Sequence, residues 1–284
     1  MKIIRADHLG MCFGVRDAID LAKQEAEINS LTVFGELVHN ETVLEDLRAR
    51  GVAIETQLRK VTTKTVMISA HGASGASIER VRQRGHNVIE ATCPLVHHAH
   101  RSLKKLVGEG YHPLVIGKRE HVEVRGLTED FAQCDVVLEP QQIADLAEQP
   151  RFGVVSQTTQ PIEKVNHLVE LLRQTFPNSE VRFIDTVCQP TKQRQTAAIE
   201  LAQRCDVVVV IGGAHSNNTR ELVATCGRFC GQVHHVQSAD ELLTEWFNGV
   251  ETVGLTAGTS TPDSTIAEVE ARLAEIAKPV LSHE

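Results

Sequence analysis

Three cysteines that recur at similar steps along the chain are the residues best suited to chemistry. Cys12, Cys93 and Cys188 are separated by 81 and 95 residues, and each follows a short β-type run and precedes a segment with helical periodicity. A cysteine at a helix N-terminus is favoured as the thiolate by the helix dipole and by free backbone N–H groups. Three such thiolates meeting at one place would repel one another unless a cation lay between them.

This donor set favours an iron–sulfur cluster over zinc. Zinc normally takes a fourth protein ligand or a catalytic water, whereas iron–sulfur clusters use thiolates as their usual ligands. Three thiolates shared among four irons leave one iron open to a substrate, where it acts as Lewis acid and electron donor together. The alternative is that each cysteine is a small buried hydrophobic residue, and spacing alone leaves the two interpretations evenly balanced.

The other four of the seven cysteines lack this context; they are Cys134, Cys205, Cys226 and Cys230. We expect them to be buried core residues, and the pair Cys226 and Cys230 has no partner motif that would indicate a metal site. An odd number of cysteines in a 284-residue chain argues against a disulfide scaffold and fits a reducing compartment. The N-terminus has no secretory signal pattern. We therefore expect a cytoplasmic protein.

The composition excludes several classes of protein. It is 42% apolar and 23% charged, as in ordinary globular domains. The net charge of −8, from 29 basic and 37 acidic residues, gives no reason to expect sequence-independent binding of nucleic acid. The apolar runs are far shorter than the roughly 20 residues that span a bilayer. We expect neither a nucleic-acid partner nor a membrane segment.

Two further sets of markers repeat with nearly the same steps as the cysteines. Three apolar runs end in glycine with a histidine shortly after, at Gly35 and His39, Gly117 and His121, and Gly212 and His215. A second set of apolar runs ends in hydroxyl residues, at Ser69, Ser156 and Thr256. Three independent markers with one period predict a threefold internal repeat.

Short runs rich in β-branched residues predict eleven strands in three groups: 31–35, 52–54, 65–69 and 87–91; 112–116, 134–138, 152–156 and 180–184; 206–211, 231–236 and 252–256. The third group is one strand short, and the run from Lys2 to Ile4 is expected to complete it. Helical patterns separate most strands, at 41–50, 75–84, 161–176, 239–248 and 264–276. Ser238 with Glu241 resembles a capping box for the helix at 239–248.

Strands alternating with helices predict parallel sheets covered by helices. The expected fold class is α/β, with three similar small α/β units, mostly parallel sheets, a pseudo-threefold axis and a central cavity. The expected units are 12–93, 94–186 and 187–276, the third completed by residues 1–11, with 277–284 as a tail. Ligands in such sheets bind beyond the carboxyl ends of the strands, so the repeated markers would face the cavity.

Eight ordered motifs resemble the 4-hydroxy-3-methylbut-2-enyl diphosphate reductase family, also called LytB. They are GMCFGV (10–15), VHN (38–40), SAHG (69–72), ATCP (91–94), EHVEVRG (120–126), SQTT (156–159), HSNNTREL (215–222) and TAGTSTPD (256–263). The resemblance runs from residue 1 to about 275. It implies that Cys12, Cys93 and Cys188 hold a [4Fe-4S] cluster whose fourth iron binds the hydroxyl group of the substrate, in agreement with the repeat.

The resemblance also implies roles for the polar motif residues. Glu123 would be the proton source, with Thr158 near the reacting hydroxyl. The substrate-binding residues would be His39, His71, His121, Ser216, Asn217, Asn218 and Ser260, with Thr191 lining the pocket. Such donors surround a diphosphate without several fixed cationic side chains, and each charge-assisted hydrogen bond contributes roughly 1.5–3 kcal/mol. Without the resemblance, His39 and His121 would equally well be helix caps.

The implied activity is reductive removal of the allylic hydroxyl of 4-hydroxy-3-methylbut-2-enyl diphosphate, giving isopentenyl and dimethylallyl diphosphates in the non-mevalonate pathway. No nicotinamide or flavin signature follows a strand, so a ferredoxin or flavodoxin is the expected electron donor. Val122 and Asn217 stand where many members of the family have Pro and Ser. Two alternatives therefore stay open: a paralogous reductase for another allylic or phosphorylated substrate, and a non-catalytic sensor that holds a cluster and a diphosphate.

Overall fold

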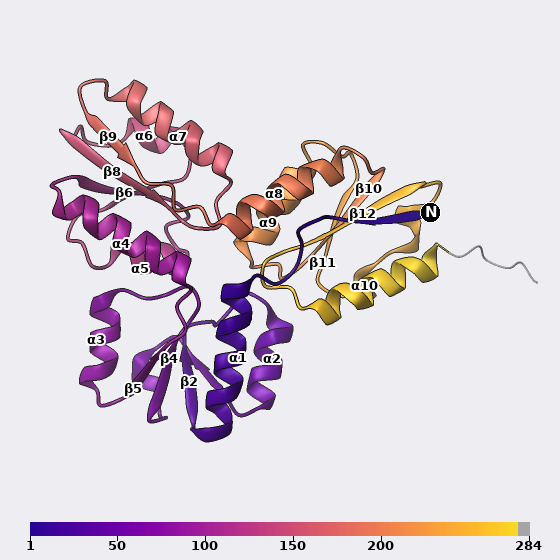
Figure 1. The fold of residues 1–284 in the computed structure, drawn as a ribbon, viewed down its shortest axis with the longest axis horizontal. Coiled ribbons are helices and arrows are strands. Elements are labelled where there is room, and N and C mark those ends of the chain that lie inside the picture. Colours follow the sequence, from indigo (N-terminus) through magenta and orange to yellow (C-terminus); the bar gives the residue numbers. More distant parts are fainter. Residues whose placement is uncertain (278–284) are drawn as a thin grey trace, which may run out of the picture. The chain divides into compact units, whose positions relative to one another are not determined.

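The structure, a computed structural model, describes residues 1–277 and contains three parallel four-stranded sheets (Figure 1). The chain forms two compact units. The larger unit, residues 13–38 and 44–188, holds two of the sheets, and the other unit, residues 1–12, 39–43 and from 189 onward, holds the third. The expected α/β class with mostly parallel sheets is therefore confirmed. No helix within the described residues is long and apolar enough to cross a membrane.

The first sheet of the larger unit has the strand order β3-β2-β4-β5. Its strands are β2 (Leu31–Phe34), β3 (Ala53–Glu55), β4 (Thr65–Ile68) and β5 (Asn87–Glu90). Its helices are α1 (Phe13–Ile28), α2 (Glu41–Ala49) and α3 (Gly75–Gln83), with the 3-10 helix η1 (Leu58–Lys60) between β3 and β4. The central strands β2 and β4 are the buried ones, because helices cover both faces of a parallel sheet.

The second sheet of the larger unit repeats this order as β7-β6-β8-β9. Its strands are β6 (His112–Ile116), β7 (Asp135–Val137), β8 (Arg151–Ser156) and β9 (Glu180–Phe183). Its helices are α4 (Pro94–Gly108), α5 (Val122–Thr128), α6 (Pro140–Ala144) and α7 (Ile162–Thr175). In α4 the buried residues recur at helical spacing, as Val96, Ala99, Leu103 and Leu106.

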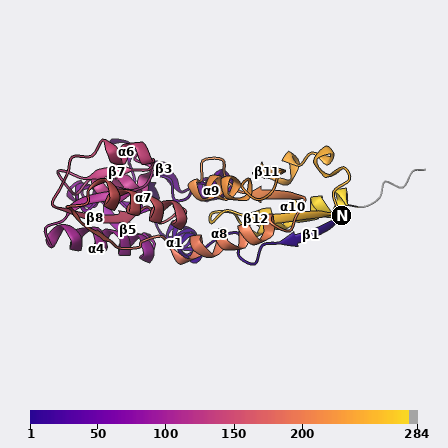
Figure 2. The same cartoon turned by 90° about the horizontal axis from the view of Figure 1, so that it is seen from above.

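The sheet of the other unit has the order β1-β12-β10-β11. Its strands are β10 (Val207–Ile211), β11 (Val233–Val236), β12 (Thr252–Ala257) and β1 (Lys2–Arg5). Its helices are α8 (Gln189–Ala202), α9 (Asn217–Cys226) and α10 (Asp263–Ile276). Strand β1 pairs with β12 over Lys2 to Arg5, so the N-terminal strand completes the last sheet as expected. Helix α10 lies beside β1, as Figures 1 and 2 show.

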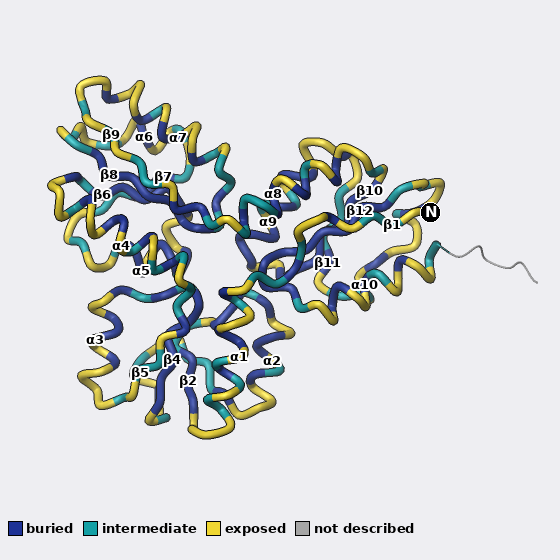
Figure 3. Tube along the Cα trace, viewed as in Figure 1, coloured by how far each residue is buried: buried dark blue, intermediate teal, exposed yellow. Residues whose placement is uncertain are grey.

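The five residues of β10 show how the core of this unit is built. All five are fully buried (Figure 3). Val207, Val209 and Ile211 belong to a core cluster that includes residues of α10, whereas Val208 and Val210 belong to one that includes residues of α8. Side chains alternate between the two faces of a strand, so both faces are apolar. Each such burial contributes roughly 1.5–3 kcal/mol.

The threefold repeat is visible in the hydrogen bonds that follow the central strands. In each sheet the glycine after β2, β6 or β10 donates its N–H to a carbonyl at the end of the neighbouring edge strand. The bonds are Gly35 to Glu55 (2.8 Å), Gly117 to Val137 (2.9 Å) and Gly212 to Val236 (3.0 Å). The glycine markers seen in the sequence are therefore structurally equivalent.

One expected helix is absent. Residues 239–248 form two short 3-10 helices, η2 (Ala239–Glu241) and η3 (Thr244–Phe247), in place of an α-helix. The Ser238 side chain makes no capping bond, and the Glu241 carboxylate accepts a hydrogen bond from the backbone N–H of Gln237 (2.8 Å). Leu242 and Phe247 are buried in the core, and the packing of these apolar side chains outweighs the local helical pattern. The tail predicted at 277–284 begins with the last described residue, and residues 278–284 lie outside the described part.

Candidate functional site

The three repeated cysteines are held by one recurring backbone hydrogen bond. In each sheet the cysteine N–H donates to the carbonyl found two residues past the end of β4, β8 or β12. The bonds are Cys93 to Ala70 (3.1 Å), Cys188 to Thr158 (3.0 Å) and Cys12 to Thr259 (3.1 Å). All three cysteines are partly exposed. Each sheet thus fixes a cysteine near the carboxyl end of its third strand, where parallel sheets bind ligands.

Cys93 has the most closely packed surroundings of the three. It is the N-cap residue of α4, its own side chain makes no capping bond, and Pro94 follows it in the first turn. Gly14, at the start of α1, lies against it, because a Cβ built on Gly14 would be only 2.4 Å from the Cys93 Sγ atom. Only glycine allows the backbone to approach the sulfur so closely.

Three of the four remaining cysteines have surroundings unsuited to thiolates. Burial raises the pKa of the Cys134 and Cys226 thiols to about 12 and also raises the pKa of Cys205. The Cys230 Sγ atom lies 3.3 Å from the Gln232 carbonyl, which it can contact as a weak donor. Cys226 and Cys230 are buried core residues as expected, whereas Cys134 and Cys205 are partly exposed. Cys12, Cys93 and Cys188 differ from these four in recurring at equivalent strand ends.

Glu123 is a buried carboxylic acid next to this framework. Its side chain is 1% exposed, and its two carboxylate oxygens accept hydrogen bonds from the N–H (2.6 Å) and the hydroxyl (2.9 Å) of Thr158. Burial raises the pKa of Glu123 to about 7, although the two bonds from Thr158 act in the opposite direction. At neutral pH a large share of Glu123 is therefore protonated and able to donate a proton.

Thr158 links this acid to a cysteine. Its N–H and hydroxyl donate to Glu123, while its carbonyl accepts the hydrogen bond from the N–H of Cys188 (3.0 Å). The motif residues Glu123, Thr158 and Cys188 thus form one hydrogen-bonded chain from three separate segments. The structure brings together a proton donor and a candidate metal ligand of the larger unit.

The other unit contains the same arrangement with an amide in place of the acid. The Asn218 Oδ1 atom accepts a hydrogen bond from the N–H of Thr259 (3.0 Å), and the carbonyl of Thr259 accepts one from Cys12. Asn218 is 2% exposed, and its Nδ2 group has no hydrogen-bond partner among residues 1–277. An unsatisfied buried N–H₂ group is costly in an empty protein. It is therefore suited to an anionic ligand.

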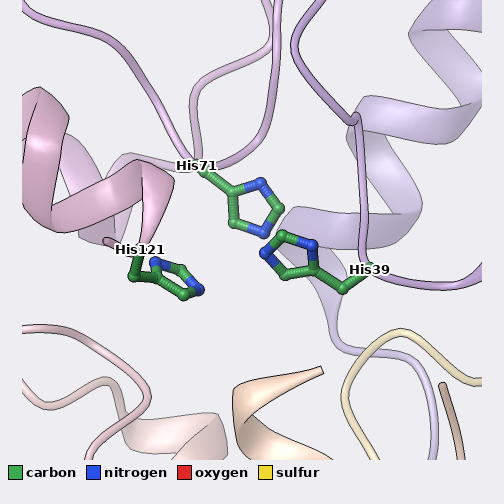
Figure 4. A group of neighbouring side chains, drawn as sticks. All are labelled: His39, His71 and His121. Carbon is green, nitrogen blue, oxygen red and sulfur yellow. The ribbon is translucent and has the colours of Figure 1, made fainter. Parts of the chain in front are cut away.

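His121 and His71 lie together in the larger unit. Their rings meet edge to face, with centroids 5.6 Å apart and planes at 89° (Figure 4). His121 is the N-cap of α5, and its Nδ1 atom accepts a hydrogen bond from the N–H of Glu123 (3.2 Å). Because Nδ1 is an acceptor, the proton of the neutral ring is on Nε2. The capping role and the donor role expected for His121 are thus compatible.

The third histidine marker, His215, does not lie at the repeat position of His121. His121 lies four residues after Gly117, and the residue four after Gly212 is Ser216 rather than His215. Ser216 caps α9 as His121 caps α5, since its Oγ atom accepts a hydrogen bond from the N–H of Thr219 (3.3 Å). His215 is exposed.

The other predicted site residues lie in the unit that contains β1; they are His39, Thr191, Ser216, Asn217 and Ser260. The backbone carbonyl of His39 faces Ser260 Oγ at 3.4 Å. Ser216, Asn217 and Ser260 are buried, and Thr191 is buried in the first turn of α8.

Sequence reasoning missed Thr259 and Arg194. Thr259 falls within the TAGTSTPD motif, and the repeat would have paired it with Thr158 had the alignment followed strand ends. Arg194, on α8, is a buried cation whose Nε (2.9 Å) and Nη2 (2.7 Å) both donate to the Gly10 carbonyl, two residues before Cys12, while its Nη1 donates to the Pro190 carbonyl (2.9 Å). Arg194 thus attaches the loop before Cys12 to α8, the helix that follows Cys188.

Fold and site together define a three-sheet α/β protein whose strand ends carry cysteines, a buried acid and amide donors. The model of the LytB protein family matches residues 3–274. The chain therefore belongs to the LytB family.

Relatives and solved structures agree with this membership. Proteins named 4-hydroxy-3-methylbut-2-enyl diphosphate reductase from Trichlorobacter lovleyi and Geobacter sulfurreducens are each 37% identical to this chain, over 97% of its length and 99% and 98% of theirs. A solved (E)-4-hydroxy-3-methyl-but-2-enyl diphosphate reductase, described as the terminal enzyme of the non-mevalonate pathway, is 34% identical, with a TM-score of 0.69 over 97% of this chain and all of that one. The Plasmodium falciparum E-1-hydroxy-2-methyl-but-2-enyl-4-diphosphate reductase is 25% identical, with a TM-score of 0.89 over 98% of this chain and 88% of that one.

Proposed function

We propose that this chain is an iron–sulfur reductase that removes the allylic hydroxyl of 4-hydroxy-3-methylbut-2-enyl diphosphate. The reaction takes up two electrons and two protons and releases water together with isopentenyl or dimethylallyl diphosphate. The names and lengths of the relatives support this substrate. The observation that carries the proposal is the hydrogen-bonded chain from Glu123 through Thr158 to Cys188. It joins a proton donor of suitable pKa to a cysteine at a strand end.

Cys12, Cys93 and Cys188 would hold a [4Fe-4S] cluster. The donor set fits such a group, because these three partly exposed cysteines recur at equivalent strand ends, whereas burial raises the pKa of the Cys134 and Cys226 thiols to about 12. When bound, the cluster supplies electrons one at a time and an iron with an open coordination position. The chain itself supplies the backbone hydrogen bonds that fix each cysteine.

The diphosphate would be bound by neutral donors. Asn218 Nδ2 is buried and free to donate, and His121 is oriented to donate through Nε2. The proposal assigns the remaining contacts to His39, His71, Ser216, Asn217 and Ser260. Donors of this kind satisfy phosphate oxygens by hydrogen bonding, at roughly 1.5–3 kcal/mol for each bond to a charged group.

Glu123 would deliver the proton that turns the hydroxyl into water. Its raised pKa keeps much of it protonated near pH 7, and Thr158 holds the carboxyl in place through two bonds. The hydroxyl of Thr158 is also the group assigned to the substrate hydroxyl. General acid catalysis of this kind typically contributes about 10²–10⁴-fold.

The electron donor in this proposal is a ferredoxin or flavodoxin, and the compartment is the cytoplasm, as the cysteine usage suggests. No observation in the structure favours a different substrate. Val122 and Asn217, which depart from the common family pattern, are both the first residue of a capped helix, α5 and α9. Val and Asn are both compatible with that position of a helix.

The test is anaerobic reconstitution followed by iron and sulfide analysis and a turnover assay with the diphosphate and reduced methyl viologen. We expect brown protein with close to four irons per chain and conversion to the two alkenyl diphosphates. Cys12→Ser should lose iron, while Cys226→Ser, a buried cysteine outside the set, should keep it. Reconstituted wild type that contains the cluster but does not turn over this diphosphate would overturn the proposed substrate.

A further inference from the structure

A pocket lined by basic side chains opens beside α4 and has no role in the proposed reaction. It has a volume of about 490 Å³ and lies within the larger unit, with walls from α4, from the segment before α3 and from residues 130–131. Its basic residues are His97, His100, Arg101 and Lys104, all on α4. His97, Arg101 and Lys104 occupy positions i, i+4 and i+7, so these three form one stripe along the helix. We call them the α4 stripe.

Two of the three residues of the α4 stripe have no local partner among the described residues, whereas His97 Nε2 lies 3.9 Å from the carboxylate of Glu90. Arg101 and Lys104 are exposed, and neither forms an ion pair with any residue of the described chain. The one carboxylate in the pocket wall is Asp130, and its two oxygens already accept hydrogen bonds from the N–H groups of Gly75 (2.7 Å) and Ala76 (3.0 Å) at the start of α3. Asp130 is thus held at the start of α3, and Arg101 and Lys104 contribute two unpaired positive charges to this surface.

Neighbouring cations are paired, which sets Arg101 and Lys104 apart. On the same helix, Lys105 lies 3.9 Å from the carboxylate of Glu109. Arg82 of α3 lies 3.2 Å from the carboxylate of Glu90. Unpaired cations gathered on one side of α4 thus stand out in a chain whose net charge is −8.

The stripe is also close to a cysteine of the site. Thr92 lines the pocket and directly precedes Cys93, which is the N-cap of α4. With a helix rise of 1.5 Å per residue, Arg101 lies about 12 Å along the axis from Cys93 and Lys104 about 16 Å. A protein bound over the pocket would therefore stand next to the end of the helix that presents Cys93.

We propose that the α4 stripe is the docking surface for a small acidic protein that carries one electron at a time. The proposal rests on the proposed function, which needs two electrons in each turnover. Two carriers would dock in turn, and each would leave oxidised by one electron, while the protons come from Glu123 and solvent. An acidic carrier is repelled at long range by the chain's net negative charge, so a local positive patch decides where it approaches.

The test compares two routes of electron supply to the reconstituted holoenzyme. Reduced acidic ferredoxin serves as the carrier and reduced methyl viologen as a small donor that needs no docking surface. In the double variant Arg101→Glu/Lys104→Glu we expect kcat/KM for ferredoxin to fall at least tenfold at low salt. Turnover with the dye and iron content should stay within about twofold. The wild-type ferredoxin rate should fall as salt rises, and the rate of the variant should not.

The matched control is Arg59→Glu/Lys60→Glu. These residues are in η1 after β3, at the opposite edge of the sheet from β5, the strand that leads into α4. The control changes the net charge equally and should leave the ferredoxin kinetics near wild type. If both variants slow the reaction alike, overall charge and not the α4 stripe controls the encounter, and the proposal is wrong.

Other outcomes are equally decisive. A double variant with unchanged ferredoxin kinetics overturns the docking surface while the proposed function stands, because dye-driven turnover remains. A wild-type chain without dye-driven turnover overturns the proposed function and this inference with it. If the glutamate variant loses iron, Arg101→Gln/Lys104→Gln takes its place and should show a smaller loss in the same direction. If inorganic phosphate protects wild type but not the variant against heating, and ferredoxin kinetics are unchanged, the pocket binds small anions and no carrier.

Discussion

At the scale of single residues, two threonines connect the cysteines to the groups that would act on the substrate. The Thr158 carbonyl accepts a hydrogen bond from the Cys188 N–H, and the Thr158 N–H donates one to Glu123. In the same way, the Thr259 carbonyl accepts from the Cys12 N–H, and the Thr259 N–H donates to Asn218. Glu123 and Asn218 each follow the N-cap of their helix by two residues. The repeat therefore places an acid in one sheet and an amide in another at the same structural position, and in the proposed function one framework would serve both proton transfer and anion binding.

Glu123→Gln should remove proton delivery while leaving the fold intact. Gln keeps an oxygen to accept from the Thr158 N–H but has no acidic proton, so we expect turnover to fall about 10²–10⁴-fold. Wild-type kcat should decline as pH rises through about 7, because the acid must be protonated to act. A steady-state pH profile measures both effects. If the variant keeps wild-type turnover with the same decline above pH 7, Glu123 is not the acid.

The same variant should change the pH dependence of stability. The pKa of Glu123 is raised on folding from 4.5 to about 7, so the folded state holds a proton that the unfolded chain releases. This residue therefore destabilises the fold increasingly as pH rises from about 4.5 to 7, with no further change above that. Glu123→Gln should abolish that trend in urea titrations.

Asn218→Asp is the comparison at the equivalent position of the other unit. It keeps the acceptor for Thr259 but loses the donor, so it should raise KM and leave iron content unchanged.

The sequence identified most of the candidate site residues but not the hydrogen bonds that join them. Spacing identified Cys12, Cys93 and Cys188, because three copies of one unit carry their cysteines at the same place. Alignment of the hydroxyl and cysteine markers did not include Thr259, because its contribution is made by its backbone N–H and carbonyl. Spacing also placed His215 at the wrong repeat position, because only the capping bond of Ser216 shows which residue begins the helix. The roles of the predicted site residues stay predictions until variants are measured.

At the scale of elements, helix starts are what position the site. Cys93, His121 and Ser216 are all N-cap residues, of α4, α5 and α9. The free N–H groups and the dipole at a helix start favour anions nearby. Thiolates and phosphates are both anions, so the same local structure suits the cofactor and the substrate. Helical periodicity after Cys93 predicted α4, but no periodic pattern was identified for α5 or α9. The prediction failed at 239–248, where Leu242 and Phe247 are buried in the core of the sheet.

Gly14→Ala tests the packing of α1 on Cys93, a proposed cluster ligand. The added Cβ would lie 2.4 Å from the Cys93 Sγ atom and 3.1 Å from its Cβ, so either α1 or the cysteine must shift. We expect at least a twofold loss of iron per chain after reconstitution, with a lowered melting temperature of the apo protein. Iron analysis and thermal unfolding measure these effects.

Gly108→Ala is the control for this variant. Gly108 also lies in a helix, and a Cβ there would meet no atom within 4 Å. Since alanine is favoured over glycine in a helix by roughly 0.5–1 kcal/mol, this control should keep its iron and be slightly more stable. Equal iron content in both variants would show that the close approach of Gly14 to Cys93 does not matter for the metal site.

At the scale of the whole molecule, three sheets with one strand order are built from a single repeated pattern. The sequence predicted all twelve strands, including the return of the N-terminal strand to the last sheet, because short β-branched runs alternate regularly with helices. The boundaries at 93/94 and 186/187 stay predictions, since the compact units number two and the larger one holds two sheets. The pseudo-threefold axis and the central cavity are likewise predictions. They concern packing between units, which local patterns do not encode.

Substitutions in strand β1 should destabilise the sheet β1-β12-β10-β11 and neither of the other two sheets. Ile3 packs on one core cluster and Ile4 on another, and both pair in register with β12. Ile3→Asn and Ile4→Asn should each destabilise this unit by roughly 1–3 kcal/mol. Hydrogen exchange should accelerate in β10 and β12 but not in β6 and β8, because the two sheets belong to different compact units. Lys2→Asn, at an exposed position of the same strand, should leave exchange unchanged. Equal acceleration in all three sheets would mean that the chain unfolds as one cooperative body and that the two units have no separate stability.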